Sequence, residues 1–261
     1  MTKWRDTKDH AVLLVGVVVM GLPLWLALVA ATRTGDIGLI PGTSLADNLQ
    51  SLDRRLEAAG PTLAGMLKVS GLTAFGVAFA CTVVSFLAAY VMVFCKVHKA
   101  WFWVSLATLY FPIEARMIAT FEVAATLGLH NTLTGLVFPI LPLAVGTFAF
   151  RQQLKSMAPE LMEAARLDAA GPFRFLRDFA VPLSLPMIGA VFAISFVLGW
   201  NQFLWPLMVS VDNSQFTLMR GFGLVRSGSG ASFVLAAISL LPPLVLLTIA
   251  MAWITRAQKP R

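Results

Sequence analysis

The sequence predicts an all-α, polytopic membrane protein with six transmembrane helices. Hydrophobic residues make up 58% of the 261 residues and charged residues only 13%. That composition is too apolar for a soluble domain, which must cover itself with water-facing side chains. The mean hydropathy of +0.79 points the same way. Six apolar runs, each near the roughly 20 residues that a helix needs to cross a bilayer, account for the composition.

The expected spans occupy almost the whole chain, which we expect to form one transmembrane domain, 1–261. They lie at about 11–31, 66–95, 101–122, 132–150, 183–209 and 232–255. The first follows three basic residues, but its length and the lack of a clear cleavage site favour an uncleaved span over a signal peptide. The second is rich in small residues, which let neighbouring helices approach closely. Six prolines inside spans can each kink a helix or merely disturb its packing, namely Pro23, Pro112, Pro142, Pro206, Pro242 and Pro243.

The basic residues predict that both termini are cytoplasmic, because Lys and Arg near short loops are retained on that side. In this orientation 13 of the 20 Lys and Arg residues lie in inner segments, and the other seven lie outside or within spans. Topology therefore explains the net charge of +7. Nucleic-acid binding is disfavoured, since the basic residues form no stripe interleaved with stacking aromatics. Cys81 and Cys95 share one apolar run and are expected to act as small hydrophobes.

The long cytoplasmic loop 151–181 is expected to contain a short helix of its own. Pro159 suits a first helical position, and Gly171-Pro172 ends the helix. The helix would have about 12 residues and a length of about 18 Å, too short and too polar to cross a bilayer. Its alanine-rich surface is nearly smooth, with Glu163 and Arg166 able to pair. A lipid-bound helix would carry bulky apolar residues opposite basic ones, so docking on a partner protein is favoured.

The spacing of motifs in this loop is specific. Glu163-Ala164-Ala165, then Asp168, and the exit Val181-Pro182-Leu183 with Pro186 resemble the EAA loop of permease subunits of bacterial ATP-binding cassette (ABC) importers. The resemblance implies a type I ABC importer fold with a cytoplasmic coupling helix that docks on an ATPase. One departure is Ala169, where the family usually has Gly. The residues implied in ATPase coupling are Glu163, Ala164, Ala165, Arg166, Asp168, Ala169, Gly171 and Pro182.

Other segments extend the resemblance over nearly the whole chain. The run Gly199-Trp-Asn-Gln-Phe-Leu-Trp-Pro-Leu207 resembles the fifth-span motif of the carbohydrate-uptake (maltose-type) branch, and 127–132 resembles its third-to-fourth connection. Phe111 to Arg116, with Phe121-Glu122-Val123, is most similar to the second permease subunit of sn-glycerol-3-phosphate importers. The resemblance implies a multi-pass protein of the bacterial inner membrane that forms half of a pathway for a sugar, polyol or glycerol-phosphate solute. The implied partners are a second permease subunit, an ATPase dimer, an extracytoplasmic solute-binding protein and the lipid bilayer, with no nucleic acid.

Polar and aromatic residues at membrane depth are candidates for the substrate pathway, because charges there are costly and usually face a cavity or a partner. Arg116 could attract a phosphate bidentately, it could pair with Glu114 or Glu122, or the whole charged group could lie near the outer interface. Stacking and hydrogen-bonding groups suited to a sugar or polyol occur in the fifth span, although they could equally be interfacial anchors. These are Trp200, Asn201, Gln202 and Trp205.

Two rival classes are less well supported. The chain has no Gly-x-x-x-x-Gly-Lys-Ser/Thr loop, so ATP and Mg are expected on a partner ATPase, with no cofactor and no metal on this chain. Its three histidines form no His-Glu-x-x-His motif, and no catalytic residues are expected, which argues against a membrane enzyme. An ion- or proton-coupled secondary transporter remains the alternative function, because Glu114 and Glu122 could serve as membrane-depth carboxylates.

Overall fold

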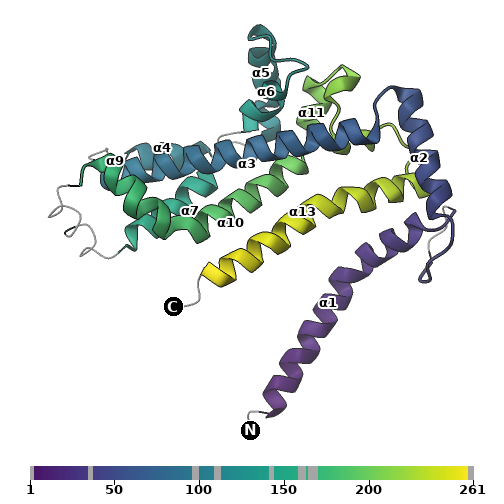
Figure 1. Ribbon diagram of the computed structural model, residues 1–261, viewed down its shortest axis with the longest axis horizontal. Coiled ribbons are helices and arrows are strands. Elements are labelled where there is room, and N and C mark those ends of the chain that lie inside the picture. Colours follow the sequence, from purple (N-terminus) through teal and green to yellow (C-terminus); the bar gives the residue numbers. More distant parts are fainter. Residues whose placement is uncertain are drawn as a thin grey trace. The chain divides into compact units, whose positions relative to one another are not determined.

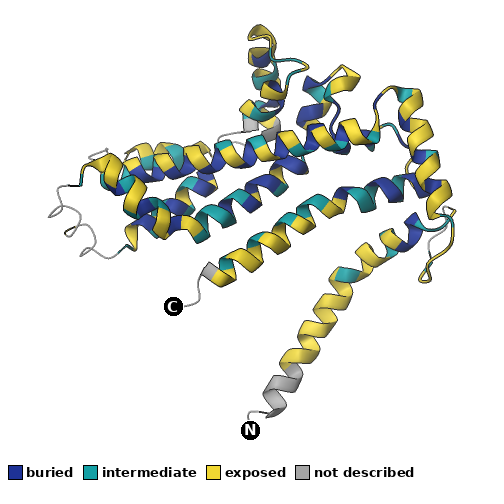
Figure 2. Ribbon diagram, in the orientation of Figure 1, coloured by how far each residue is buried: buried dark blue, intermediate teal, exposed yellow. Residues whose placement is uncertain are grey.

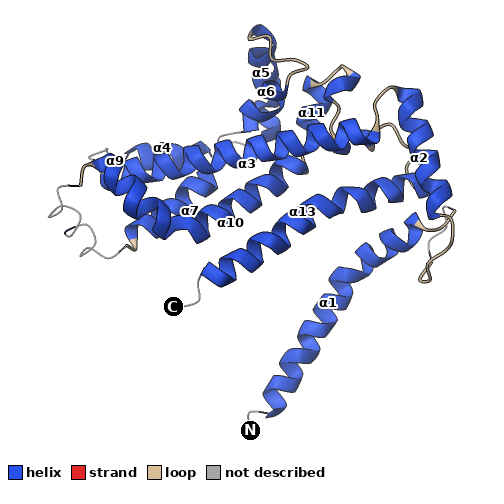
Figure 3. Ribbon diagram, viewed as in Figure 1, coloured by secondary structure: helices blue, strands red, loops and turns tan. Residues whose placement is uncertain are grey.

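The computed structural model of the chain is built from helices joined by loops (Figure 3). It describes residues 3–34, 38–95, 100–108, 113–140, 144–157, 163 and 170–257, with the side chains of 3–8, 113, 114, 140 and 257 excepted. Over these residues no strand occurs. The all-α fold class predicted from the sequence is therefore confirmed.

Four helical segments are long and apolar enough to cross a bilayer, judged by length and composition (Figure 1). They are Asp9–Ala31, Leu63–Phe94, Pro172–Trp200 and Gly230–Arg256. The first belongs to α1 (Lys3–Ala31), the second is α3 (Leu63–Phe94), and the last belongs to α13 (Gly230–Ala257). They correspond to the first, second, fifth and sixth expected spans.

The third and fourth expected spans each contain shorter helices. The third holds α4 (Ala100–Ala107) and α5 (Ile113–Thr126). The fourth holds α6 (Leu133–Val137), η2 (Phe138–Ile140) and α7 (Ala144–Lys155). Pro112 and Pro142 lie outside the described residues, in the segments between these helices. Six continuous spans thus remain a prediction.

The fifth span is displaced toward the N-terminus of its expected range. Gly171 has an extended backbone and Pro172 takes the first position of α9 (Pro172–Phe175). A five-residue π-helical turn, η3 (Leu176–Ala180), then leads into α10 (Val181–Trp200). Gly171-Pro172 therefore begins a helix, as proline readily does because the first helical N–H needs no partner. The expected end at residue 209 is not reached as one helix, since residues 201–203 are non-helical and separate α10 from α11 (Leu204–Val209).

The chain divides into two compact units. Unit 1 comprises Met1–Ala64 with Arg220–Pro242, and unit 2 comprises Gly65–Met219 with Pro243–Arg261. Unit 1 holds all of α1, all of α2 (Leu45–Ala59) and the beginning of α13, up to Pro242. The apolar length of α1 is almost entirely exposed (Figure 2). Such a surface is suited to contact with lipid or with another membrane subunit, because its exposed side chains are apolar.

In unit 1, one buried amide joins the end of α1 to α2. The Asn48 side chain donates hydrogen bonds from Nδ2 to the carbonyl of Ala31 at 2.9 Å and to that of Arg33 at 2.7 Å. A β-carbon added at Gly230, the first residue of α13, would collide with the Asn48 side chain. Asn48 thus satisfies carbonyls at the end of α1, which have no partner within their own helix.

Replacing this amide should destabilise unit 1. We expect Asn48→Ala to lower the free energy of unfolding by about 2 kcal/mol, because two carbonyls lose a donor at a largely buried site. The thermal midpoint of the purified protein in detergent measures the effect. Gln50→Ala, on an exposed position of the same helix, is the control and should leave the midpoint nearly unchanged. Equal midpoints for the two variants would contradict the assigned role of Asn48.

In unit 2, small residues mark the places where helices approach most closely. A β-carbon at Gly146 of α7 would lie 3.0 Å from Ser85 Oγ of α3 and 3.3 Å from Val191 Cγ1 of α10. One built at Gly199 of α10 would lie 3.0 Å from Val77 Cβ of α3. Helices α3, α7 and α10 therefore pack directly on one another, in the way small residues permit inside a membrane.

Candidate functional site

A buried apolar cluster lies where the end of α3, the end of α7 and the beginning of α9 and α10 meet. Its fully buried members are Phe86, Ala89, Tyr90, Phe150, Leu154, Phe175, Ala180 and Val191. Partly buried residues around it include Met157, just before the loop segment 158–169, and Ala170, just after it. The described residues on either side of this segment are therefore packed against the same cluster.

Polar contacts reinforce the cluster on both sides of the segment. After it, the Tyr90 hydroxyl donates to the carbonyl of Pro172 at 2.6 Å. Before it, Gln153 Nε2 donates to the carbonyl of Leu183 at 3.3 Å, which joins α7 to α10. The Arg151 guanidinium lies 3.8 Å from the centre of the Phe102 ring on α4, a distance typical of a cation–π contact. The two ends of the segment are thus fixed by hydrogen bonds as well as by packing.

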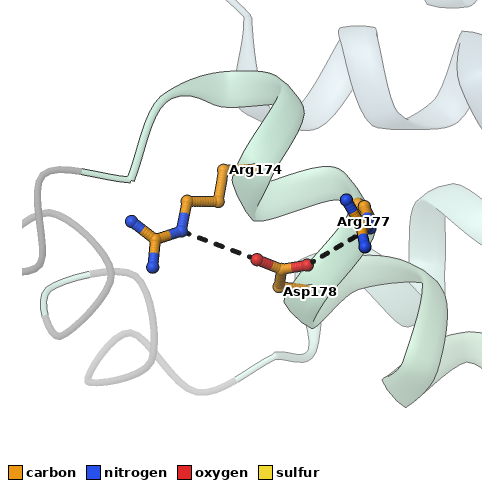
Figure 4. Close-up of polar contacts among 3 residues, drawn as sticks. All are labelled: Arg174, Arg177 and Asp178. Carbon is orange, nitrogen blue, oxygen red and sulfur yellow. Dashed lines mark ion pairs between the residues drawn. The ribbon is translucent and has the colours of Figure 1, made fainter.

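An exposed charged group follows the segment directly. Asp178 lies between two arginines, 3.6 Å from Arg174 Nε and 3.7 Å from Arg177 Nε (Figure 4). The arginine side chains are 66% and 81% exposed, so the pairs contribute little to stability. Because two guanidinium groups share one carboxylate, this surface keeps an excess positive charge.

The structure describes three of the residues expected to couple the chain to an ATPase. Glu163 is helical and exposed, Gly171 is exposed at the start of α9, and Pro182 is exposed in the first turn of α10. Most of the expected helix over 159–170 lies outside the described residues. The same holds for the remaining coupling candidates, which are Ala164, Ala165, Arg166, Asp168 and Ala169.

Two tryptophans expected along the substrate pathway are buried in packing contacts. Trp205 is 3% exposed and donates from Nε1 to the carbonyl of Gly135 at 3.0 Å, within a cluster that joins α11 to α5 and α6. Trp200 is also 3% exposed and stacks on Phe196, with ring centroids 6.0 Å apart. Asn201 is exposed and Gln202 half-buried in the non-helical residues between α10 and α11. In this conformation the amides, and not the indoles, are accessible to a solute.

The charged pathway candidates all lie on α5. Arg116 is half-buried and Glu122 exposed, whereas the side chain of Glu114 lies outside the described residues. Glu122 comes six positions after Arg116, which places the two side chains about 120° apart around the helix. Among the described side chains no ion pair joins them. Arg116 is therefore not neutralised by Glu122 here, while a pairing with Glu114 stays open.

Sequence reasoning missed Tyr90, which contacts the loop from 82 positions away in the sequence. The only local signal was a phenol near the end of an otherwise apolar span. A buried tyrosine hydroxyl usually has a hydrogen-bond partner, so that signal predicts a polar contact without identifying it.

Four helical segments that are long and apolar enough to cross a bilayer define the class of the chain as a multi-pass membrane protein. The chain belongs to the family of inner membrane components of binding-protein-dependent transport systems, whose model matches residues 73–260. It is thus a permease subunit of an ABC importer, as predicted from the loop motif. Family membership also decides against the secondary transporter, and it places the chain among transport components.

Relatives match over nearly their full length. The sn-glycerol-3-phosphate transport system permease protein UgpE of Rhizobium meliloti (strain 1021) is 35% identical, covering 95% of this chain and 93% of the relative. The protein of the same name from Yersinia pestis is 37% identical, covering 96% and 95%. A chain in the crystal structure of a bacterial ABC transporter involved in the import of the acidic polysaccharide alginate aligns with a TM-score of 0.76 and 16% identity, covering 97% of this chain and 98% of that chain. At that identity the likeness establishes the fold alone, which is the type I importer fold.

Proposed function

We propose that this chain forms half of the translocation pathway of an importer for sn-glycerol 3-phosphate or a close glycerol-phosphate analogue. The observation that carries the proposal is the 35–37% identity to permeases named for this transport, over more than nine-tenths of both chains. A second permease subunit would complete the pathway. An extracytoplasmic binding protein would deliver the solute, and an ATPase dimer would bind ATP and Mg.

The segment 158–169 would couple this chain to the ATPase from the cytoplasmic side, with both termini on that side too. Packing of Met157 and Ala170 against one cluster supports this role. A force applied to the segment would reach α3, α7 and α10 together, because all three contribute to that cluster. Rigid transmission of this kind lets closure of a partner bias a two-state bundle between inward-open and outward-open forms.

A transport assay tests the proposed solute. The chain would be co-expressed with its neighbouring permease, ATPase and binding protein in cells that cannot otherwise take up sn-glycerol 3-phosphate. We expect uptake of the labelled compound, weak competition by glycerol and no competition by maltose. Competition by maltose as strong as that by unlabelled sn-glycerol 3-phosphate would contradict the proposed glycerol-phosphate solute and indicate a sugar instead.

Arg116 is the candidate contact for the phosphate group. We expect Arg116→Ala to lower sn-glycerol 3-phosphate uptake about ten-fold, and Arg116→Lys to lower it less, because a guanidinium binds phosphate oxygens bidentately while an ammonium is a point charge. The control is Arg54→Ala, which removes an exposed arginine from α2 and should change uptake less than two-fold. If uptake by Arg116→Ala equals that of the control, the proposed contact between Arg116 and the phosphate group is contradicted.

A further inference from the structure

The Tyr90 side chain connects α3 to the exit of the loop. Tyr90 is 5% exposed, and the hydrogen bond from its hydroxyl to the Pro172 carbonyl is short at 2.6 Å. The carbonyl lies in the first turn of α9, immediately after the loop segment 158–169. The hydrogen bond thereby joins the end of α3 to the start of α9, and these two helix ends lie side by side (Figure 1).

Aromatic rings hold the two helices together around this hydrogen bond. The Phe94 ring of α3 lies 5.1 Å from Tyr90 and 5.1 Å from Phe175 of α9, the latter in an edge-to-face arrangement. Phe175 in turn stacks on Phe179, with centroids 5.6 Å apart. Such pairs are directional, because the ring quadrupole favours offset and edge-to-face arrangements. The four rings therefore fix how α9 is oriented on α3.

Helix α3 also contacts helices α6, α7 and α10 at several further points. Ser85 lies beside Gly146 of α7, and Gly76 beside Val137 of α6. On either side of Gly76 in the sequence, Ala74 and Val77 lie beside Gly199, at the end of α10. An α-helix of this length is a stiff rod of about 48 Å, so a displacement at Tyr90 moves its contacts with α6, α7 and α10 as well.

We infer that Tyr90 is a positioning residue for transport. Its hydroxyl holds α9, which follows the loop, against α3, so that a movement of the loop is transmitted through α3 to the end of α10. The inference rests on the proposed coupling function of segment 158–169. Without the hydroxyl, α9 could rotate against α3 when the ATPase pulls on the loop. ATP would then be hydrolysed with fewer solute molecules imported.

The hydroxyl can be removed with little effect on stability. The Pro172 carbonyl also accepts the backbone N–H of Leu176, so it stays hydrogen-bonded in Tyr90→Phe. The phenylalanine ring keeps the aromatic contacts. Loss of a donor is costly chiefly when its acceptor is left buried and unpaired, which is not the case here. Any change in coupling can therefore be separated from unfolding.

The test measures ATP hydrolysed per solute imported in proteoliposomes holding the complete importer and its binding protein. We expect this ratio to rise at least three-fold in Tyr90→Phe, with the melting temperature unchanged. The ratio is taken per assembled complex, so a lower yield does not alter it. Ser70→Ala is the matched control, since Ser70 also lies on α3 and its buried hydroxyl accepts from the Leu218 N–H at 2.7 Å. We expect it to lower the melting temperature and leave the ratio unchanged.

The inference is overturned if Tyr90→Phe keeps the wild-type ratio, or if Ser70→Ala raises the ratio equally. A parallel measurement on Glu163→Lys separates this failure from that of the proposed function. A changed ratio in Glu163→Lys with an unchanged one in Tyr90→Phe rejects only the role of Tyr90. Unchanged ratios in both variants reject coupling through segment 158–169.

Discussion

Glu163→Lys should reduce solute uptake by roughly a hundred-fold while leaving the permease in the membrane. Glu163 is exposed and helical within the proposed coupling segment, so its carboxylate is available to a partner. Reversing one charge of a docked pair removes an attraction and adds a like-charge contact, which together cost about 2–5 kcal/mol. Because Glu163 contributes nothing to a buried core, we expect the amount and melting temperature of the purified permease to stay unchanged.

Stimulation of ATP hydrolysis by the solute-loaded binding protein measures this effect. In the assembled importer with Glu163→Lys, hydrolysis should no longer respond to the binding protein. Glu57→Lys is the matched control, because it makes the same charge reversal on an exposed position of α2. We expect Glu57→Lys to retain uptake and stimulation. Normal uptake by Glu163→Lys would exclude the coupling role of this residue.

The sequence was sufficient to predict the fold class and four spans of full length, because each run of apolar residues is itself the signal for a membrane helix. The helical segment that carries the expected fifth span, about 183–209, runs instead over Pro172–Trp200. Gly171-Pro172 is compatible with both the end of one helix and the start of the next, and the structure uses it as a start. The non-helical residues 201–203 carry no helix-breaking glycine or proline, so hydropathy alone continued the span through them.

The site was predicted only where it depends on a local motif. Spacing within the loop identified the class of protein, which family membership confirms, whereas the role of Glu163 stays a prediction. Contacts between distant residues had no such signal. Asn48 is one polar residue among several on an amphipathic helix, and only the fold brings it to the carbonyls of Ala31 and Arg33. From the sequence, Trp205 could be interpreted as a residue that stacks on the solute. In the structure its indole N–H donates a hydrogen bond to the carbonyl of Gly135, 70 positions earlier.

The surroundings of Gly199, the first residue of the fifth-span motif, explain why a glycine occupies that position. It is buried where α10 crosses α3, and an added β-carbon would lie 3.1 Å from the Ala74 Cα, a backbone atom that cannot rotate away. Between apolar helices in lipid, close packing provides much of the attraction, since lipid chains are as apolar as the side chains. A side chain at this position would therefore weaken the contact that holds the two helices together.

Gly199→Leu is expected to abolish most of the folded permease. The leucine adds four carbon atoms where even the first lies only 3.0 Å from Val77 Cβ and 3.1 Å from Ala74 Cα, which costs about 3 kcal/mol and separates α10 from α3. The yield of monodisperse protein in detergent and its melting temperature measure the loss. Gly71→Leu is the matched control, because Gly71 also lies inside a long apolar helix but has no atom within 4 Å of an added β-carbon. There leucine should stabilise the helix slightly, by up to about 1 kcal/mol, through its higher helix propensity. Equal losses in the two variants would show that any large side chain in a small-residue helix is harmful, and would remove the special role of the crossing at Gly199.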